Sequence, residues 1–536
     1  MRAHIQKNAI PTRRSGKKRL LKLLPSRLFI VGVLILLQLF VLLYALVELG
    51  TRQYWVSIIF KFLSFLMVLC ILPREDNPSY KISWIILIMA VPLVGGIFYL
   101  MFGMKRNSRR MAQQIERYTQ SLFHRDHGQP VLAPKPGEQP IDRLAARYPM
   151  LARQAGYIQR VSGFNLYENT EVEYFPSGEA FYAKLLEELR KAQKFILLEY
   201  FIIHPGKMWD SIFKVLEQRR DHGVQIRILY DDVGCVTTLP ALYPDYLRQK
   251  GFEVGIFNPF HPQLNAATNY RDHRKICVID GNVGFTGGIN LADEYINLRK
   301  RYGHWKDTGF RLTGEGVHSF THMFLTFWNA FALKKGEGGT PMPTLQDSAE
   351  APRETDGYVL SYYDSPLEHD ATSNQLFIDL LSQSTDYAWF FTPYLMLGDD
   401  LMAAMLAAAR RGVDVRIIMP GIPDKKLIFR MSRSFYQVLL NGGVKIYEYT
   451  PGFVHAKSFV SDDKVATIGT VNLDYRSLFL HFENNSLFYR AGIVEKIKED
   501  FLATQALCSE VQPYDKKRYS RRWAVDGLLR IFAPLC

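Results

Sequence analysis

The sequence predicts a duplicated α/β fold that follows a group of membrane-spanning helices. Three observations support this fold class. The first hundred residues contain long apolar runs without a charge, the remainder alternates short β-rich runs with helix-like segments, and one order of elements occurs twice. The 536 residues, 48% of them hydrophobic, exclude a disordered chain. The length corresponds to about three or four domain-sized units of ~150 residues each.

Composition restricts the partners and the compartment. The chain has 66 Lys+Arg and 52 Asp+Glu, a net charge of +14, which indicates a phosphate-bearing partner, either nucleic acid or an anionic membrane surface. The five cysteines are scattered and form no C-x-x-C pair. Free thiols in a reducing compartment are therefore expected, and neither a disulfide scaffold nor a structural zinc site is indicated.

Two segments near the N-terminus are long enough to cross a membrane. Residues 28–47 and 82–103 each lack a charge and match a ~30 Å hydrocarbon core at 1.5 Å per helical residue. Residues 54–72 are also apolar but contain Lys61, so they form either a third span or an interfacial helix. A cleaved signal peptide is the alternative for the first run, which is longer than the apolar part of such peptides.

Flanking charges predict the orientation of the protein in the membrane. The N-terminal extension, residues 1–27, has nine Lys/Arg and no acid, and five more basic residues lie in 104–117. The positive-inside rule places both flanks in the cytoplasm, which requires an even number of spans. We expect a multi-pass membrane protein whose large domain after the apolar segments lies in the cytoplasm. The number of spans and the side of the N-terminus stay open.

Composition shifts divide the chain into seven segments. A Pro/Gly-rich stretch separates the membrane region from two halves of similar size, and a polar linker separates the halves from one another. A basic amphipathic tail ends the chain. We expect this tail to lie on an anionic leaflet, with a solvated basic helix as the alternative. The segments are an extension (1–27), a transmembrane region (28–110), a connector (111–159), half 1 (160–333), a linker (334–357), half 2 (358–513) and the tail (514–536).

The two halves repeat one pattern of apolar β-rich runs. Helix-like segments separate these runs, as expected for an α/β unit. The runs are 195–203, 223–232, 251–257 and 272–290 in half 1, and 387–396, 412–421, 442–449 and 454–472 in half 2. The aromatic stripe 320–331 and the Cys277 side chain are both expected in the hydrophobic core.

Each half carries the same chemical motif at the same place. A histidine is followed at +2, +7, +14 and +17 by Lys, Asp, Gly and Asn. One such motif would be weak, but two copies in step within an internal repeat are not expected by chance. The motif residues are His273, Lys275, Asp280, Gly287 and Asn290 in half 1, and His455, Lys457, Asp462, Gly469 and Asn472 in half 2.

The spacing within each motif has chemical content. In a strand, residues i and i+2 share a face, so each His and its Lys point to one side, and the Asp falls in a hairpin turn. Two such faces related by a pseudo-twofold axis would gather two His, two Lys and two Asn in one pocket. This set suits a phosphodiester whose charge builds up on its oxygens in the transition state. One His would attack phosphorus, and the other would act as general acid and base.

These paired motifs resemble the phospholipase D superfamily, over about residues 160–490. Further segments are similar to bacterial cardiolipin synthases, and this resemblance covers nearly the whole chain. It implies two α/β/α sandwich halves of the phospholipase D type and a membrane-bound phosphatidyltransferase. The segments are PREDNP (73–78), LLEYFII (197–203), GGINLADEY (287–295), GHWKDTGFRLTG (303–314), NGGVKIYEYTPGFVHAK (441–457) and LLRIFAPLC (528–536).

The resemblance also implies the reaction and its residues. Such an enzyme transfers a phosphatidyl group between two phosphatidylglycerol molecules, releases glycerol and uses no metal or other cofactor. The implied catalytic residues are His273, Lys275, Asp280, His455, Lys457 and Asp462. The family favours the first histidine as nucleophile, which makes His273 the attacking group and His455 the general acid and base. The symmetry of the motifs does not itself decide this order.

Supporting residues are expected around the catalytic set. Asn290 and Asn472 are candidates for binding phosphate, and each catalytic His needs a carboxylate on its other ring nitrogen. Glu483, which follows the second motif, is the expected partner of His455. For His273 the choice is between Glu294 and Asp307.

Four functions remain compatible with the motifs. They are a cardiolipin synthase, a hydrolytic phospholipase D that uses water as acceptor, a phosphodiesterase acting on nucleic acid, and a lipid-binding scaffold without activity. The distribution of charge favours a membrane partner over nucleic acid, because residues 118–513, which hold both motifs, have a net charge of −4. The basic excess instead flanks the apolar runs and fills the tail. The sequence does not give the oligomeric state or the second lipid substrate.

Overall fold

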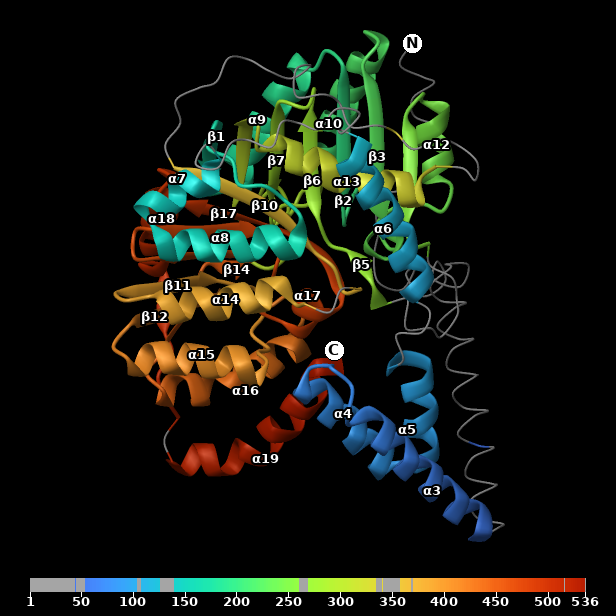
Figure 1. Ribbon diagram of the computed structural model, residues 1–536, viewed down its shortest axis with the longest axis vertical. Coiled ribbons are helices and arrows are strands. Elements are labelled where there is room, and N and C mark those ends of the chain that lie inside the picture. The colour runs from blue at the N-terminus through green and yellow to red at the C-terminus, as the bar shows by residue number, and fades with distance from the viewer. Residues whose placement is uncertain are drawn as a thin grey trace.

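The computed structural model describes residues 44, 54–103, 108–125, 139–259, 269–333, 340, 357–367, 370–514 and 516–535 (Figure 1). The N-terminal extension, nearly all of the predicted span 28–47 and most of the linker 334–357 lie outside these residues. Within them, no helix combines the length and the apolar character that crossing a membrane requires.

The described N-terminal region is a small group of helices. It comprises α3 (Tyr54–Ile71), α4 (Pro78–Ala90), α5 (Pro92–Phe98) and the π-helical turn η1 (Tyr99–Gly103). The predicted continuous span 82–103 is therefore broken at Val91, which precedes Pro92 and leaves the helical region at φ −134° and ψ 77°. The proline lacks an N–H and disfavours a helical residue before it. Gly95 allows the next segment to pack closely, because a Cβ there would lie 2.4 Å from the Leu87 carbonyl oxygen.

Three helices of the predicted connector lead into the two halves. They are α6 (Ser108–Arg125), α7 (Pro140–Arg147) and α8 (Pro149–Ser162). Helix α6 packs against α13 (Val317–Phe331) of half 1, whereas α8 packs against α14 (Thr372–Gln383) and β10 (Tyr358–Asp364) of half 2. The helices that precede half 1 in sequence thus contact both halves.

Half 1 contains a mixed seven-stranded sheet in the order β1-β9-β7-β6-β2-β3-β4. Parallel pairs at one side (β2–β3–β4) and antiparallel pairs at the other follow from helical crossovers and hairpins respectively. The strands are β1 (Thr170–Phe175), β2 (Phe195–Tyr200), β3 (Gln225–Asp231), β4 (Glu253–Phe257), β6 (Lys275–Ile279), β7 (Val283–Gly287) and β9 (Gly309–Gly314).

Half 2 repeats this sheet with one strand added at its edge, in the order β10-β17-β16-β15-β11-β12-β13-β18. The repetition of strand order confirms the predicted duplication of an α/β unit. The remaining strands of half 2 are β11 (Tyr387–Phe391), β12 (Asp414–Pro420), β13 (Lys445–Tyr449), β15 (Ser458–Ser461), β16 (Val465–Gly469), β17 (His481–Tyr489) and β18 (Cys508–Glu510).

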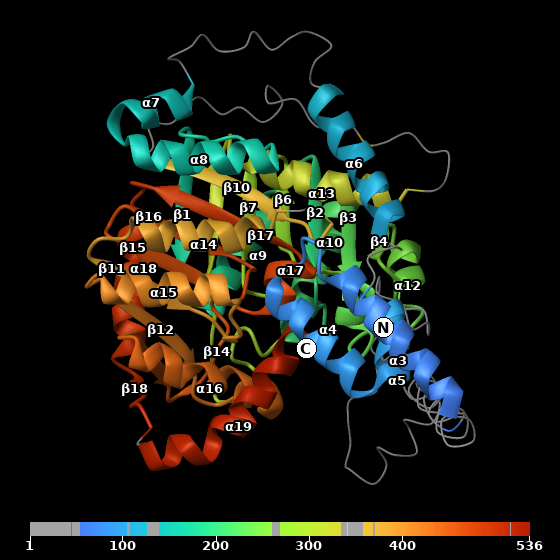
Figure 2. The same ribbon diagram turned by 60° about the horizontal axis from the view of Figure 1, so that its bottom comes forward.

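Helices cover both sheets. In half 1, α9 and α10 lie on one face and α13 on the other, and in half 2, α14, α15 and α16 lie opposite α18 (Figures 1 and 2). The aromatic stripe 320–331 belongs to α13, which is buried along nearly its whole length, and Cys277 is buried in β6, so both core predictions are confirmed. The bounds are α9 (Gly178–Lys191), α10 (Lys207–Asp221), α11 (Asp232–Cys235), α12 (Tyr243–Gln249), α15 (Asp399–Arg410), α16 (Lys426–Asn441), α17 (Tyr475–Phe479) and α18 (Ile493–Gln505).

Two short strand pairs connect the halves. The two-residue strand β5 (Arg271–Asp272) of half 1 pairs in parallel with the start of β17. Reciprocally, β14 (Gly452–Val454) of half 2 pairs in parallel with β8 (His304–Lys306) of half 1. Each cross-half pair stands immediately before one of the two motif histidines.

The C-terminal helix returns to the N-terminal helices. Helix α19 (Lys516–Phe532) and the 3₁₀ turn η5 (Ala533–Leu535) follow β18. The α19 helix packs on α16, where Arg530 Nε donates to the Ser434 carbonyl over 3.1 Å, and the Ser83 hydroxyl donates to the Ile531 carbonyl over 2.6 Å. The C-terminal segment therefore contacts the N-terminal group of helices through α4, in the lower part of Figure 1.

Candidate active site

The cross-half strands place the two histidines at the contact between the halves. His273 lies between β5 and β6, and its backbone N–H donates to the Phe482 carbonyl of half 2 over 2.9 Å. His455 lies between β14 and β15, and its N–H donates to the Lys306 carbonyl of half 1 over 2.7 Å. Both side chains are more than 90% buried. The geometry is the pseudo-twofold arrangement that the repeated motifs predict.

A carboxylate orients each imidazole through Nδ1. Glu483 lies on the His273 side, with its oxygens 2.9 and 3.0 Å from the His273 Nδ1. Asp307 lies on the His455 side, with its Oδ2 2.7 Å from the His455 Nδ1. A carboxylate at Nδ1 holds the proton there, which leaves the lone pair of Nε2 for a substrate.

The predicted pairing of these carboxylates is wrong. The expectation was Glu483 for His455 and either Glu294 or Asp307 for His273, and the structure exchanges the partners across the halves. The physical reason is the cross-half pairing of β17 with β5 and of β8 with β14, which carries Glu483 to one histidine and Asp307 to the other. Glu294 orients neither ring, since both Nδ1 atoms are held by the other two acids.

The two motif lysines share the buried site with the histidines. Lys275 is 1% exposed and Lys457 3% exposed, and the Nζ of each donates to the carbonyl oxygen of its own motif histidine. Burial lowers the pKa of Lys275 to about 7 and that of Lys457 to about 8. Burial thus disfavours the charged form of each lysine, and a bound anion would favour it.

The pKa values of the histidines show that the two motifs act on one another. Burial lowers the pKa of His273 to about 3, and the positive charge of Lys275 adds to this effect. Burial lowers the pKa of His455 to about 4, together with the charges of Lys457 and, from the other half, Lys275. Although burial acts in the opposite direction, His273 holds the pKa of Glu483 far below its usual value, and His455 lowers that of Asp307.

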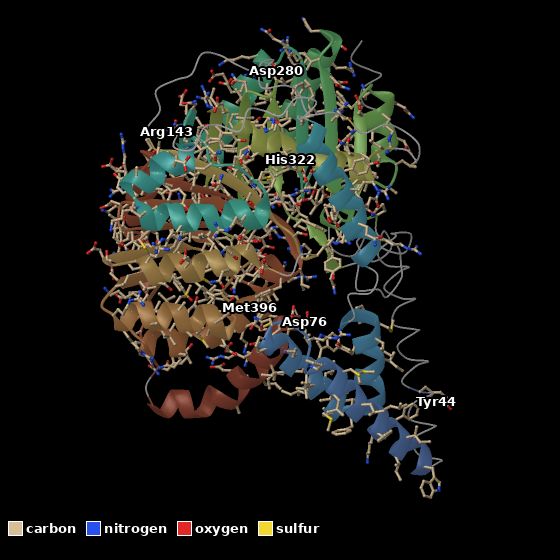
Figure 3. The ribbon with its side chains drawn as sticks, viewed as in Figure 1. Tyr44, Asp76, Arg143, Asp280, His322 and Met396 are labelled. Atoms are coloured by element: carbon tan, nitrogen blue, oxygen red, sulfur yellow. The ribbon has the colours of Figure 1, made fainter. Side chains whose placement is uncertain are left out.

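The structure places Asp280 and Asp462 away from this site, which corrects their predicted catalytic role. Asp280 follows β6 at the end opposite Lys275, where its carboxylate accepts the backbone N–H groups of Gln193, Lys194 and Phe195 at 2.8, 2.7 and 2.9 Å. Figure 3 shows it at the outer end of half 1. Asp462 does the same before β11, accepting the N–H groups of residues 385–387. Each aspartate lies five positions beyond its lysine along the strand, about 17 Å at 3.3 Å per residue.

The repeated spacing of these aspartates in the two halves therefore has a structural explanation. Both adopt left-handed backbone conformations, with φ 54° at Asp280 and 53° at Asp462, as the hairpin turn requires. The motif glycines also serve the backbone: a Cβ at Gly287 would lie 2.4 Å from the Thr308 carbonyl oxygen, and one at Gly469 would lie 2.3 Å from that of Asn484. Adjacent strands could not approach this closely with a side chain present.

The two motif asparagines differ. Asn290 is engaged within the protein, since its Oδ1 accepts the Ile202 N–H over 3.0 Å and its Nδ2 donates to the Tyr295 hydroxyl over 2.7 Å. Asn472 is 6% exposed, and its Oδ1 is buried without a hydrogen-bond partner among the described residues. This oxygen is an acceptor, so it does not itself support the predicted binding of phosphate, which requires a donor.

The residues surrounding the two histidines break the symmetry of the site. His455 is enclosed by aromatic rings, with ring centroids of Trp305, Tyr295 and Phe453 at 5.3, 5.4 and 5.9 Å. His273 instead contacts Phe201 at 5.0 Å and a third histidine, His481, at 5.5 Å.

Sequence reasoning missed two residues on the His273 side. The Ser477 hydroxyl donates to Glu483 over 2.6 Å, and the His481 ring lies two residues before that acid on β17. A signal was present for His481, because the spacing His481-x-Glu483 puts both side chains on one strand face. His273, His481 and Glu483 also form a group whose donor atoms all lie within 4.8 Å of one another, the spacing at which side chains can hold a metal ion.

Comparisons with known proteins relate this chain to lipid-synthesising enzymes. The family model described as cardiolipin synthase, PLD-like domain, matches residues 185–302 and 377–504, and one described as phospholipase D-nuclease N-terminal matches residues 62–103. Cardiolipin synthase 2 of Bacillus anthracis is 34% identical over 480 residues, covering 88% of this chain and 90% of the relative. Cardiolipin synthase of Alkalihalophilus pseudofirmus is 33% identical over 509 residues, covering 93% and 98%.

Two further comparisons extend this result. An uncharacterized protein of Streptococcus mutans is 42% identical over 481 residues, covering 87% of this chain and 99% of the relative. Among solved structures, phosphatidylserine synthase of Haemophilus influenzae superposes with a TM-score of 0.53 at 14% identity, covering 71% of this chain and 98% of that one. At this identity the structural match shows a shared fold.

Proposed function

Since this chain belongs to the family of cardiolipin synthases with two phospholipase D-like domains, we propose that it joins two phosphatidylglycerol molecules into cardiolipin and releases glycerol. The observation that carries the proposal is the exchange of carboxylates between the halves, which gives one pocket two oriented imidazoles beside two buried lysines. Such a pocket offers a nucleophile, an acid and positive charge for a single phosphodiester.

The first step breaks the bond between phosphorus and the glycerol headgroup. Nε2 of His273 donates its lone pair to phosphorus while the P–O bond to the leaving glycerol breaks, and His455 donates the proton that glycerol takes away. The product is a phosphatidyl group linked to His273 through an N–P bond. Lys275 and Lys457 stabilise the charge that accumulates on the non-bridging oxygens.

The second step transfers the phosphatidyl group to a new alcohol. His455, now neutral, removes the proton from the headgroup hydroxyl of a second phosphatidylglycerol, and the resulting oxygen attacks phosphorus. The N–P bond to His273 breaks, cardiolipin leaves, and both histidines return to their initial state. Each step is an exchange of one phosphodiester or phosphoramidate bond for another, so the sequence needs no external energy source.

The assignment of roles to the two histidines rests on their surroundings. Burial gives His273 a pKa of about 3, so its ring is neutral near pH 7 and its Nε2 lone pair is available, as a nucleophile requires. Burial lowers the pKa of His455 as well, to about 4. Asp307 and the anionic phosphate of a bound lipid both favour its protonated form, as a general acid requires.

We propose further that the protein is a multi-pass protein of a bacterial plasma membrane with its catalytic halves in the cytoplasm. The two apolar runs 28–47 and 82–103 and their basic flanks support this placement. The exposed apolar side chains of α3 also support it, among them Trp55, Ile59 and Phe62, which are 76%, 56% and 60% exposed. The basic tail adds positive charge that anionic headgroups attract.

Product analysis tests the proposed reaction. Purified protein in mixed micelles with phosphatidylglycerol should yield cardiolipin and glycerol in equal amounts. His273→Ala and His455→Ala should each abolish both products, and His222→Ala, which changes an exposed histidine on half 1, is the matched control. Formation of phosphatidic acid without cardiolipin would assign the chain to the hydrolytic phospholipases instead. Unchanged turnover in the two active-site variants would remove the mechanism altogether.

A further inference from the structure

His481 occupies a position that the proposed phosphatidyl transfer does not use. In the pseudo-twofold arrangement Glu483 corresponds to Asp307, so His481 stands where the other half has Trp305. Both ring nitrogens of His481 are buried and have no hydrogen-bond partner within the described chain. A buried polar group without a hydrogen-bond partner destabilises the folded state, so a further role is expected for His481.

The donor atoms around His481 match the ligand set of a zinc ion. The His481 Nδ1 lies 3.6 Å from the Glu483 Oε1, and the His273 Nδ1 lies 2.9 Å from the Glu483 Oε2. Ligand atoms at 2.0–2.2 Å from a tetrahedral zinc ion are about 3.3–3.6 Å apart, and the donor atoms of the three residues all lie within 4.8 Å of one another, so side-chain adjustments can complete the site. Two imidazoles and one carboxylate are ligands that Zn²⁺ prefers, with a fourth position open to water.

We propose that His273, His481 and Glu483 form a binding site for a zinc-like transition-metal ion that reversibly inhibits the enzyme. The metal binds the Nδ1 of His273 in place of the proton that this atom shares with Glu483. Because a neutral imidazole carries one N–H, the displaced proton moves to Nε2, and the lone pair needed for attack on phosphorus is lost. Occupancy also places a divalent cation against Glu483, which then no longer orients the ring.

Other charges near His481 set the strength of this site. The positive charges of Arg476 and Lys275 oppose the binding of a metal cation here. The negative charges of Glu483 and Asp474 favour it. The site lies at the start of β17, beside α17 and β5 (Figure 1). It differs from the His455 side, where Trp305 supplies no comparable ligand, so one metal site per chain is expected at the contact between the halves.

Metal binding can be measured without substrate. Equilibrium dialysis of the purified, metal-free full-length protein against Zn²⁺, and the visible absorption of Co²⁺ as a spectroscopic substitute, report occupancy directly. His481→Phe should lose one bound ion per chain and the Co²⁺ absorption. The exposed His222→Phe is the matched control and should lose neither. His481→Gln serves the same purpose if the phenylalanine variant unfolds, because it keeps a polar side chain without the imidazole ligand.

Inhibition is the second readout, and it rests on the proposed function. Zn²⁺ should lower the initial rate of the wild-type protein at least tenfold. In His481→Phe the initial rates with and without Zn²⁺ should be nearly equal, whatever the variant's own rate. Equal Zn²⁺ binding by the wild type and His481→Phe would overturn the proposal, and so would the absence of the Co²⁺ absorption from both. Binding without inhibition would keep the metal site but contradict the role of His273 as nucleophile.

Discussion

Glu483 and Asp307 hold the two histidines in the same way but are supported differently. Glu483 also accepts the Ser477 hydroxyl over 2.6 Å, whereas Asp307 also accepts the backbone N–H of Thr308 over 2.9 Å. Because His455 must carry a positive charge when it acts as acid, loss of the Asp307 charge should slow proton transfer rather than weaken lipid binding.

Asp307→Asn should lower kcat by about 10²–10⁴-fold with little change in KM, since the amide keeps the shape of the side chain but no longer stabilises the imidazolium. Initial rates against phosphatidylglycerol concentration measure both constants. Asp245→Asn, which changes an exposed carboxylate of half 1, is the control. A variant with normal kcat and a raised KM would show that Asp307 contributes to substrate binding instead.

Substitution of Asp280 can distinguish a structural role of the motif aspartate from a catalytic role. Its carboxylate satisfies three backbone N–H groups in the turn before β2, so Asp280→Ala should lower the free energy of unfolding by about 1–3 kcal/mol. The rate per folded molecule should stay within a few-fold of the wild type. Chemical denaturation and kcat, measured on the same preparation, distinguish the two effects. A large loss of kcat with unchanged stability would return Asp280 to the catalytic set.

The buried histidines make stability dependent on pH. His273 and His455 titrate near 6.5 when unfolded and at about 3 and about 4 when folded, because burial opposes their charged forms. Between these limits the unfolded chain binds more protons, so stability is full above about pH 6.5 and is lost as the pH falls toward 4. The depressed pKa of Asp307 adds a loss of the same sign below about pH 4.

Denaturant unfolding at pH 7.5 and pH 5 should therefore show a lower free energy of unfolding at pH 5, by an amount on the order of 2–4 kcal/mol for the two histidines together. The double variant His273→Gln and His455→Gln should show a smaller difference between the two pH values. An equal pH dependence in this variant and the wild type would assign the effect to other groups.

At the scale of elements, two short strand pairs determine the active site. Strand β5 has only two residues and β14 and β8 have three each, yet their pairing brings the carboxylate of each half to the histidine of the other. The sequence predicted the longer strands, the repeated order and the His-x-Lys faces because these follow from local periodicity. It could not predict the exchanged carboxylates, because strands this short have no periodicity and their partners lie about 150 to 210 residues away.

Gly452 shows how closely β14 and β8 approach. A Cβ at Gly452 would lie 2.1 Å from the His304 carbonyl oxygen and 2.4 Å from its nitrogen, so Gly452→Ala must push the strands apart and displace Asp307 from His455. We expect this variant to lose at least tenfold in kcat. Gly492→Ala is the matched control, because a Cβ there would meet nothing within 4 Å. Equal kcat values for the two variants would show that the strand pair does not position the acid.

At the scale of the whole molecule, the N-terminal and C-terminal helices form one region. Leu535 packs with Ile71, Trp84 and Ile88, and the Ser83 hydroxyl bonds the Ile531 carbonyl, although these segments are more than 400 residues apart. Charge and hydropathy predicted that both ends of the chain face lipid, but not that they contact each other. The break at Val91 was also missed, because the apolar run 82–103 continues through Pro92 and masks it.

The side of the membrane on which each basic flank lies can be determined by labelling from outside the membrane. In a background without reactive cysteines, two variants each provide one thiol. Arg13→Cys lies before the apolar segments in the sequence, and Asp245→Cys lies after them, in half 1. If the halves are cytoplasmic, Asp245→Cys should react with a membrane-impermeant maleimide only after permeabilisation of the cells. Reaction in intact cells would contradict the proposed location, because position 245 is exposed on the folded protein.

The second thiol then determines whether the number of spans is even or odd. With an even number, the N-terminal extension shares the cytoplasm with the catalytic halves, and Arg13→Cys should be protected in intact cells in the same way. With an odd number, Arg13→Cys should react in intact cells while Asp245→Cys does not. We expect protection of both, because nine basic residues without an acid at 1–27 and five at 104–117 each favour the cytoplasmic side.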